Sequence, residues 1–204
     1  MGNGNVDVSS LIGRARRAEP GALDRLLESY RNYLRLLART GIDDSLQGKA
    51  DPSDLVQETL LKAHQRFGQF QGSNEAQLAA WLRQILAHAL IDLVRRFRMT
   101  EARRTSRERS LDDLLAESSQ ALGNLIAGRD ASPSGSAQRR ELSVVLADAL
   151  ADLSADYREI IVLRSIRELD WEQVAERMRR SPGAARLLWT RALKQLRPLI
   201  EARL

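Results

Sequence analysis

Apolar residues recur every three or four positions through most of this 204-residue chain, and that spacing is the strongest constraint on its fold. The clearest example is the stretch from Ala76 to about Met99, whose apolar positions are Leu78, Leu82, Ile85, Leu86, Ala89, Leu90, Leu93 and Phe97. This is the period of one face of an α-helix, whereas no stretch keeps up the alternation of a β-strand. We therefore predict an all-α protein.

The helical pattern is divided by a segment rich in Gly, Ser and Pro, GRDASPSGSA at residues 128–137. Such a composition is typical of a flexible linker. We accordingly predict two small helical domains, residues 8–100 and 139–204, joined by a linker over 101–138. Residues 110–127 within that linker carry a weaker helical pattern.

Local signals predict where several helices begin. Pro20-Gly21 separates two helices between Val8 and about Arg39. Asp51-Pro52 and Ser181-Pro182 each combine a capping side chain with a proline that suits the first helical position. We expect a helix to start at each of these two dipeptides.

The composition excludes several classes of function. The chain has 0 Cys and 2 His, so it offers no disulfide framework and no credible metal site. It also lacks a phosphate-binding loop and any Ser-His-Asp or Cys-His set. We therefore expect no catalytic residues, no cofactor and no enzymatic activity. The N-terminus lacks the features of a signal peptide and no apolar run is long enough to span a membrane, which predicts a cytoplasmic protein that does not engage the membrane.

The last third of the chain has the shape of a helix-turn-helix, in the segment LDWEQVAERMRRSPGAARLLWTRALKQLR. Projected at about 100° per residue, one side of its last helix is apolar and can pack on Val174 and Met178. The apolar side carries Ala185, Leu188, Trp189, Ala192 and Leu196. The other side carries Arg186, Leu187, Thr190, Arg191, Lys194 and Arg197.

Positive charge is concentrated in this segment. From Arg177 to the C-terminus there are eight basic residues and one acid, Glu201. That asymmetry suits a helix placed against DNA phosphates, with its N-terminal residues at base edges. The alternative is a helical hairpin with a solvated basic face, because such faces are common.

Two segments together resemble the RNA polymerase sigma factors of bacteria. ADPSDLVQETLLKAHQRFGQF and AAWLRQILAHALIDLVRRFR resemble the second conserved region of that family, and LSADYREIIVLRSIRELDWEQVAERMRRSPGAARLLWTRALKQLR resembles the fourth. The matches cover roughly residues 20–100 and 140–200, in the family's order. The absence of the other sigma regions indicates the small extracytoplasmic-function class. The resemblance implies a factor that binds core polymerase, directs promoter recognition and supports DNA melting at transcription initiation.

The resemblance implies a polymerase-binding surface on the helix that follows Asp51. Four residues at helical spacing would face the coiled coil of the polymerase beta-prime subunit: Asp54, Gln57, Glu58 and Leu61. An acidic and polar patch with one exposed leucine suits a basic partner helix. Leu61 departs from the family, which usually has Phe there. The alternative is a solvated helix face.

The resemblance places the minus-ten promoter element on the helix over 76–99. The implied DNA-binding residues are Gln84, His88, Arg95, Arg96 and Arg98. Ile91 and Asp92 are expected on the same side, opposite the apolar stripe, with Asp92 pairing with a neighbouring Arg. His88 stands where the family usually has Asn, and a solvated His88 is the alternative. Trp81 is expected in the core.

For the minus-thirty-five element, the resemblance implies the outer side of the last helix and the turn before it. These residues are Arg180, Arg186, Leu187, Thr190, Arg191, Lys194 and Arg197. Arg186-Leu187-Leu188 departs from the family's common basic-Ser-Arg run, so the promoter sequence cannot be transferred from relatives. The implied partners are core RNA polymerase, through the beta-prime coiled coil and the beta flap, promoter DNA and, as a further candidate, an anti-sigma factor.

Two other functions compete with this interpretation. A dimeric helix-turn-helix regulator would bind two-fold operators without polymerase, but it leaves the acidic patch at 54–61 unexplained. A helical enzyme or its adaptor would need a catalytic constellation that the sequence does not contain.

Overall fold

The computed structural model describes residues 7–42, 51–98, 111, 113–122 and 136–204, and of residues 96–98 and 136–141 the backbone only. Among these residues every regular element is helical, which confirms the predicted all-α class. The predicted N-terminal tail and the Gly- and Ser-rich segment 128–137 lie largely outside the described residues. The chain forms two compact units, residues 6–119 and 120–204.

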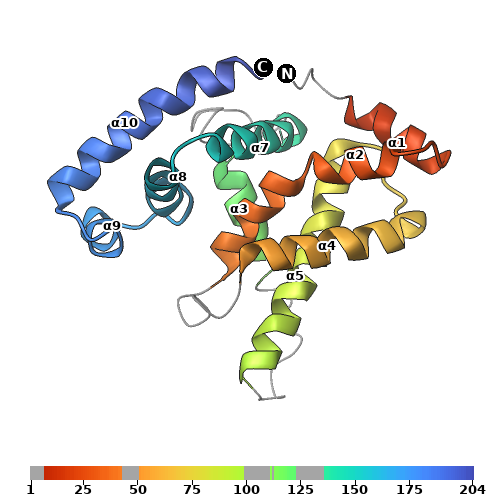
Figure 1. Cartoon of the computed structure of the whole chain (residues 1–204), viewed down its shortest axis with the longest axis horizontal. Helices are drawn as coiled ribbons and strands as arrows, with labels where there is room; N and C mark the ends of the chain where they lie inside the picture. Colours follow the sequence, from red (N-terminus) through yellow and green to blue (C-terminus); the bar gives the residue numbers. More distant parts are fainter. Residues whose placement is uncertain (1–6, 43–50, 99–110, 112, 123–135) are drawn as a thin grey trace. The chain divides into compact units, whose positions relative to one another are not determined.

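The helices of the N-terminal unit pack around one apolar core (Figure 1). Their bounds are α1 Val8–Arg16, α2 Ala22–Glu28, α3 Arg31–Gly41, α4 Pro52–Arg66, the 3-10 turn η1 Phe67–Gln69 and α5 Glu75–Arg98. Asp51 caps α4 as predicted, because its carboxylate accepts a hydrogen bond from the Ser53 N–H at 2.8 Å. The fully buried leucines of α5 face α3 and α4, which both contact it.

The turn between α1 and α2 is held by charged side chains. Arg14 and Arg17 donate hydrogen bonds to Glu19 at 2.7 and 2.9 Å, and these hold the pKa of the Glu19 carboxyl below its usual range. Gly21 follows in the left-handed region at φ 70° and begins α2. A further break at Ser29–Tyr30 separates α2 from α3, where the sequence predicted one continuous helix to about Arg39.

Residues 113–122 are helical and lie within the stretch 101–138 that the sequence assigned to the linker. Leu115 is fully buried, and the Tyr33 hydroxyl donates a hydrogen bond to Ser119 Oγ at 2.9 Å. Gly41 allows this close packing, because a Cβ there would lie 2.7 Å from Leu90 Cδ1 and 3.3 Å from Leu115 Cδ2. This part of the predicted linker therefore belongs to the N-terminal unit up to residue 119.

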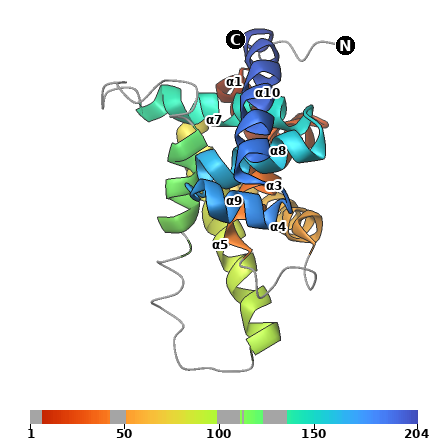
Figure 2. The ribbon, with the colours of Figure 1, turned by 90° about the vertical axis from the view of Figure 1, so that its left-hand side faces the viewer.

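The C-terminal unit consists of α7 Ser136–Ala151, α8 Ala155–Ile161, the π-helical turn η3 Val162–Ile166, α9 Trp171–Arg177 and α10 Pro182–Glu201. Figures 1 and 2 both show α10 running along α8 and past α9, and α10 contacts α7, α8 and α9. Arg158 satisfies the end of α7, since its guanidinium donates to the carbonyls of Leu150, Ala151 and Leu153 at 2.7 to 2.9 Å.

A non-glycine residue in the left-handed region makes the turn between α9 and α10. Arg179 has φ 51°, and its N–H donates to the Glu176 carbonyl at 3.1 Å. A side chain at positive φ is sterically strained, and a helix-turn-helix often has Gly in its turn. This position therefore costs the C-terminal unit some of its stability.

Arg179→Gly is expected to raise the free energy of unfolding by about 1 kcal/mol, because relief of the strain exceeds the added backbone entropy of glycine. Urea unfolding followed by circular dichroism measures the change. Arg179→Ala is the matched control, since it removes the same charge and keeps the left-handed Cβ. A gain in Arg179→Ala equal to that in Arg179→Gly would show that charge, and not backbone strain, sets the stability at this position.

Candidate functional site

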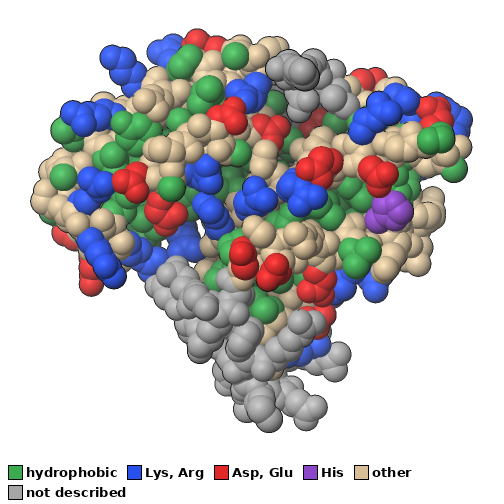
Figure 3. Space-filling model, in the orientation of Figure 1, with side chains coloured by type: hydrophobic (Ala, Val, Ile, Leu, Met, Phe, Trp, Pro, Cys, Tyr) green, Lys and Arg blue, Asp and Glu red, His purple; other side chains and the backbone are tan. Residues whose placement is uncertain are grey.

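The four predicted polymerase-binding residues lie on the outer side of α4, and we call them the α4 patch (Asp54, Gln57, Glu58 and Leu61). The inner side of this helix is buried through Leu55, Val56, Thr59 and Ala63. Within the patch Asp54 and Gln57 are exposed, and 60% of Leu61 is exposed to solvent. Figure 3 shows acidic side chains over the first part of α4 on the face turned to the viewer.

Glu58 differs from the other patch residues, because it is half-buried and already paired. Lys62 Nζ lies 2.7 Å from Glu58 Oε1 and 3.7 Å from Asp92 Oδ2, so one ammonium joins α4 to α5. Asp92 also accepts from Arg95 at 3.2 Å, in agreement with the predicted pairing of Asp92 with an arginine. Sequence reasoning missed Lys62, although its four-residue spacing from Glu58 is that of a helical ion pair.

Fewer residues are exposed on the outer side of α5 than predicted. Gln84 and His88 are exposed, and Arg95 is half-buried beside Asp92. Ile91 was expected on the same open side, but it is 5% exposed, so that expectation is wrong. A helix that contacts α3 and α4 has little surface left for solvent, and Ile91 faces the protein instead. The side chains of Arg96 and Arg98 lie outside the described residues.

The ring of His88 has a defined orientation. Its Nδ1 lies 2.6 Å from the Gln84 carbonyl oxygen, which can only accept a hydrogen bond. Nδ1 therefore carries a proton, and in the neutral ring the exposed Nε2 is an acceptor. This geometry lets His88 accept a hydrogen bond from an exocyclic amino group of a base.

Trp81 at the start of α5 was expected in the core, and it is only partly buried, although it packs in an aromatic cluster. Its ring lies 5.1 Å from that of Phe70 and 6.4 Å from that of Phe67, measured between ring centroids. The three aromatic side chains pack α5 against η1 and the loop after it. Trp81 is therefore occupied by protein contacts.

The helix-turn-helix is set by two caps. Asp170 and Gln173 form a reciprocal capping box at the start of α9. Ser181 accepts from the Ala184 N–H at 3.2 Å and, with Pro182, starts α10 as predicted. The apolar side of α10 is buried at Ala185, Ala192 and Leu196.

All six residues predicted for the outer side of the last helix are exposed, and we call them the α10 face (Arg186, Leu187, Thr190, Arg191, Lys194 and Arg197). Basic side chains recur along the outer side of α10 in Figure 3, and 53% of Leu187 is exposed. Two arginines are engaged elsewhere: Arg197 pairs with Glu201 at 3.1 Å, and Arg180 pairs with Asp156 at 2.6 Å. Among the described residues no carboxylate pairs with Arg186, Arg191 or Lys194.

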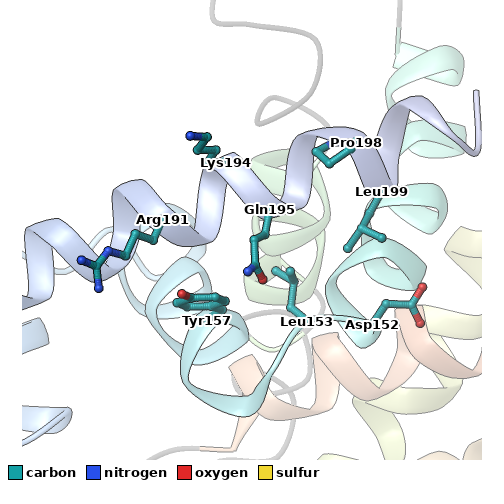
Figure 4. Close-up of a pocket in the computed structure, with 8 residues that line it drawn as sticks. All are labelled: Asp152, Leu153, Tyr157, Arg191, Lys194, Gln195, Pro198 and Leu199. Atoms are coloured by element: carbon teal, nitrogen blue, oxygen red, sulfur yellow. The ribbon is translucent and has the colours of Figure 1, made fainter.

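A shallow hollow of about 600 Å³ lies between the α7–α8 turn and α10 (Figure 4). Its lining is Asp152, Leu153, Tyr157, Arg191, Lys194, Gln195, Pro198 and Leu199. In Figure 4 Leu153, Gln195 and Leu199 point into the gap between α8 and α10, whereas Lys194 points away from it. The hollow thus combines the apolar Leu153 and Leu199 with the polar side chain of Gln195. Sequence reasoning did not find it, because the α7–α8 turn and α10 are far apart in the chain.

The described part of the chain holds no group of three or more His, Cys, Asp or Glu side chains that could bind a metal ion. No helix in it is both long and apolar enough to cross a membrane.

Comparison with known proteins identifies the family. Residues 26–100 match the model "Sigma-70 region 2" and residues 143–196 match "Sigma-70, region 4". The RNA polymerase sigma factor CarQ of Myxococcus xanthus is 30% identical over 147 residues, which cover 72% of this chain and 73% of CarQ. The chain belongs to the RNA polymerase sigma factors.

Two further relatives place this sigma factor in the extracytoplasmic-function class. It is 25% identical to the ECF RNA polymerase sigma-E factor of Haemophilus influenzae, over 94% of each chain. It is 26% identical to the ECF RNA polymerase sigma factor SigM of Bacillus subtilis, over 87% of this chain and 94% of SigM. The predicted family is confirmed.

Membership defines what the chain does. An ECF sigma factor binds core RNA polymerase and directs promoter recognition and DNA melting at transcription initiation. Sigma factors are non-catalytic initiation factors. Their function consists of binding the polymerase core and promoter DNA.

Proposed function

We propose that three surfaces of this sigma factor divide the work of promoter recognition. The α4 patch, in a domain spanning residues 8–100, docks on the coiled coil of the polymerase beta-prime subunit. Gln84, His88 and Arg95 of that domain, together with Arg96 and Arg98, hold the minus-ten element. The α10 face and Arg180, in a domain spanning 139–204, bind the minus-thirty-five element. Because core polymerase and promoter DNA are in the bacterial cytoplasm, the protein would act there.

One observation carries this proposal most directly: the whole α10 face is exposed, and Arg186, Arg191 and Lys194 have no carboxylate partner among the described residues. Exposed guanidinium and ammonium groups on one helix can neutralise phosphates, and an arginine near the start of the helix can present its donor fork to a guanine. Arg180 and Arg197 would have to exchange their present carboxylates for phosphates.

The hollow in Figure 4 supports a contact with the polymerase beta flap. Its interior is lined by Leu153, Tyr157 and Leu199, and such a surface can take an apolar side chain of a partner. Lys194 points away from it, so docking there leaves that side chain available for DNA. The anti-sigma partner that the resemblance implies stays a prediction.

The roles of Arg186 and Lys194 are expected to differ. Arg186→Ala should cost roughly 1–3 kcal/mol on the preferred upstream element and less on a duplex altered at the contacted base. Lys194→Ala should weaken binding evenly across sequences and lower the salt slope by about 1.

The measurement is a filter-binding titration of holoenzyme on duplexes whose preferred upstream element has first been selected from a randomised library. Each variant is titrated at several salt concentrations on the selected duplex and on its single-base variants. Equal losses on every sequence for both variants would make Arg186 a phosphate contact and remove it from base recognition.

A further inference from the structure

An aromatic and cationic cluster lies beside the first turns of α10. Trp171 is the first residue of α9, and the guanidinium carbons of Arg164 and Arg186 lie 5.0 and 5.7 Å from the centroid of its ring. Both distances are within the roughly 6 Å range of a cation–π interaction. Side chains of η3, α9 and α10 thus meet at one indole ring.

The ring of Trp171 is fixed on several sides. The Asp170 and Gln173 capping box holds its backbone, and Trp189 packs edge-on at 5.8 Å with an interplanar angle of 80°. Trp189 is itself fixed by donating its indole N–H to Ser165 Oγ at 3.3 Å. Arg164 is tied down by a hydrogen bond to the Leu169 carbonyl at 3.0 Å. Trp171 is therefore a rigid platform.

Arg186 differs from Arg164 at this platform, because its side chain is exposed, whereas Arg164 is half-buried and bonded to the Leu169 carbonyl. An unrestrained arginine has many rotamers, and it must lose them to present its planar fork to one base. The face of Trp171 limits these rotamers before DNA arrives. Arg164 adds a second positive charge beside the ring, so the cluster repels cations and favours an approaching phosphate or base acceptor.

We infer that Trp171 is a positioning residue for Arg186 and that it sets base discrimination at the minus-thirty-five element. This inference rests on the proposed role of Arg186 in base recognition. The cation–π contact restrains Arg186 in the free protein. Less conformational entropy of this side chain is then lost when it binds a base, so the base contact contributes more to affinity. Trp171 itself does not touch DNA in this scheme.

The experiment uses holoenzyme containing the full chain and the selected duplexes described above. Discrimination is the ratio of affinities for the preferred element and for each single-base variant. Trp171→Leu should lower this ratio by roughly two- to fivefold, the size of an exposed cation–π contact, and at the same base position as Arg186→Ala. Trp171→Phe, which keeps an aromatic face, should retain most of the ratio. The salt slope should stay at its wild-type value in both Trp171 variants, and Trp171→Leu should add nothing to Arg186→Ala in the double variant.

Three outcomes would overturn the inference. Wild-type discrimination in Trp171→Leu, with a loss in Arg186→Ala, would overturn it while leaving the proposed role of Arg186 intact. No positional effect in Arg186→Ala would overturn both. Equal losses in Trp171→Phe and Trp171→Leu would show that the indole acts by its volume. Thermal melting checks that each variant folds, and Trp171→Met, whose flexible side chain fills gaps well, replaces Trp171→Leu if the latter does not.

Discussion

A sigma factor carrying Asp54→Arg and Leu61→Ser is expected to bind core RNA polymerase at least about 100-fold more weakly while remaining folded. The arginine would place like charge against a basic coiled coil, which costs several kcal/mol, and the serine removes an apolar side chain that the partner would bury. About 1.4 kcal/mol corresponds to each factor of ten in affinity. Both positions are exposed on α4, so the core of the N-terminal unit is unaffected.

The measurement is a titration of labelled sigma factor with core polymerase, followed by fluorescence anisotropy. Glu117→Arg is the matched control, because Glu117 is exposed in the same unit but lies outside the region 2 match. Glu58 is left unchanged, since its reversal would break the ion pair between Glu58 and Lys62 as well as altering the patch. Normal core binding by a well-folded double variant would contradict the assignment of the α4 patch.

His88→Ala is expected to reduce open-complex formation by about tenfold, the effect of losing one base contact of roughly 1–3 kcal/mol. With Nδ1 bonded to the Gln84 carbonyl, Nε2 of the neutral ring is left as an acceptor, and an unpaired base offers open edges and faces to such a group. Binding to core polymerase and duplex recognition by the C-terminal unit should not change, because His88 belongs to neither surface.

Permanganate reactivity of the melted thymines measures this effect, beside a gel shift of the closed complex. His88→Asn should retain most of the activity, because an amide can also accept a hydrogen bond and the family usually has Asn at this position. Gln65→Ala, an exposed change on α4, controls for the loss of a polar side chain. Wild-type thymine reactivity in His88→Ala would mean that His88 is only a solvated residue of α5.

Features encoded within a few neighbouring residues could be predicted from the sequence. Asp51-Pro52 and Ser181-Pro182 start α4 and α10 because a cap and a proline act on the backbone beside them. The α10 face was also predictable, since a helix packed on one side separates its residues by their angle alone. The family resemblance supplied the functions, which periodicity cannot give.

Features that depend on distant parts of the chain could not be predicted. Ile91 is buried because other elements cover α5 where the projection left an open side. Lys62 reaches Asp92 on α5 through a contact that no local pattern encodes. The break between α2 and α3 at Ser29–Tyr30 has no proline or glycine to mark it.

The left-handed backbone at Arg179 has a consequence for how this protein would respond to selection. Glycine would suit the turn better, yet arginine contributes positive charge beside α10, the helix that we propose binds the promoter. Variants recovered for heat resistance should therefore be enriched for Gly at this codon, whereas variants recovered for transcription of a reporter should keep Arg. Natural proteins commonly have less than maximal stability at positions that serve activity. A library randomised at residue 179 would therefore compare selection for stability with selection for transcription at one position.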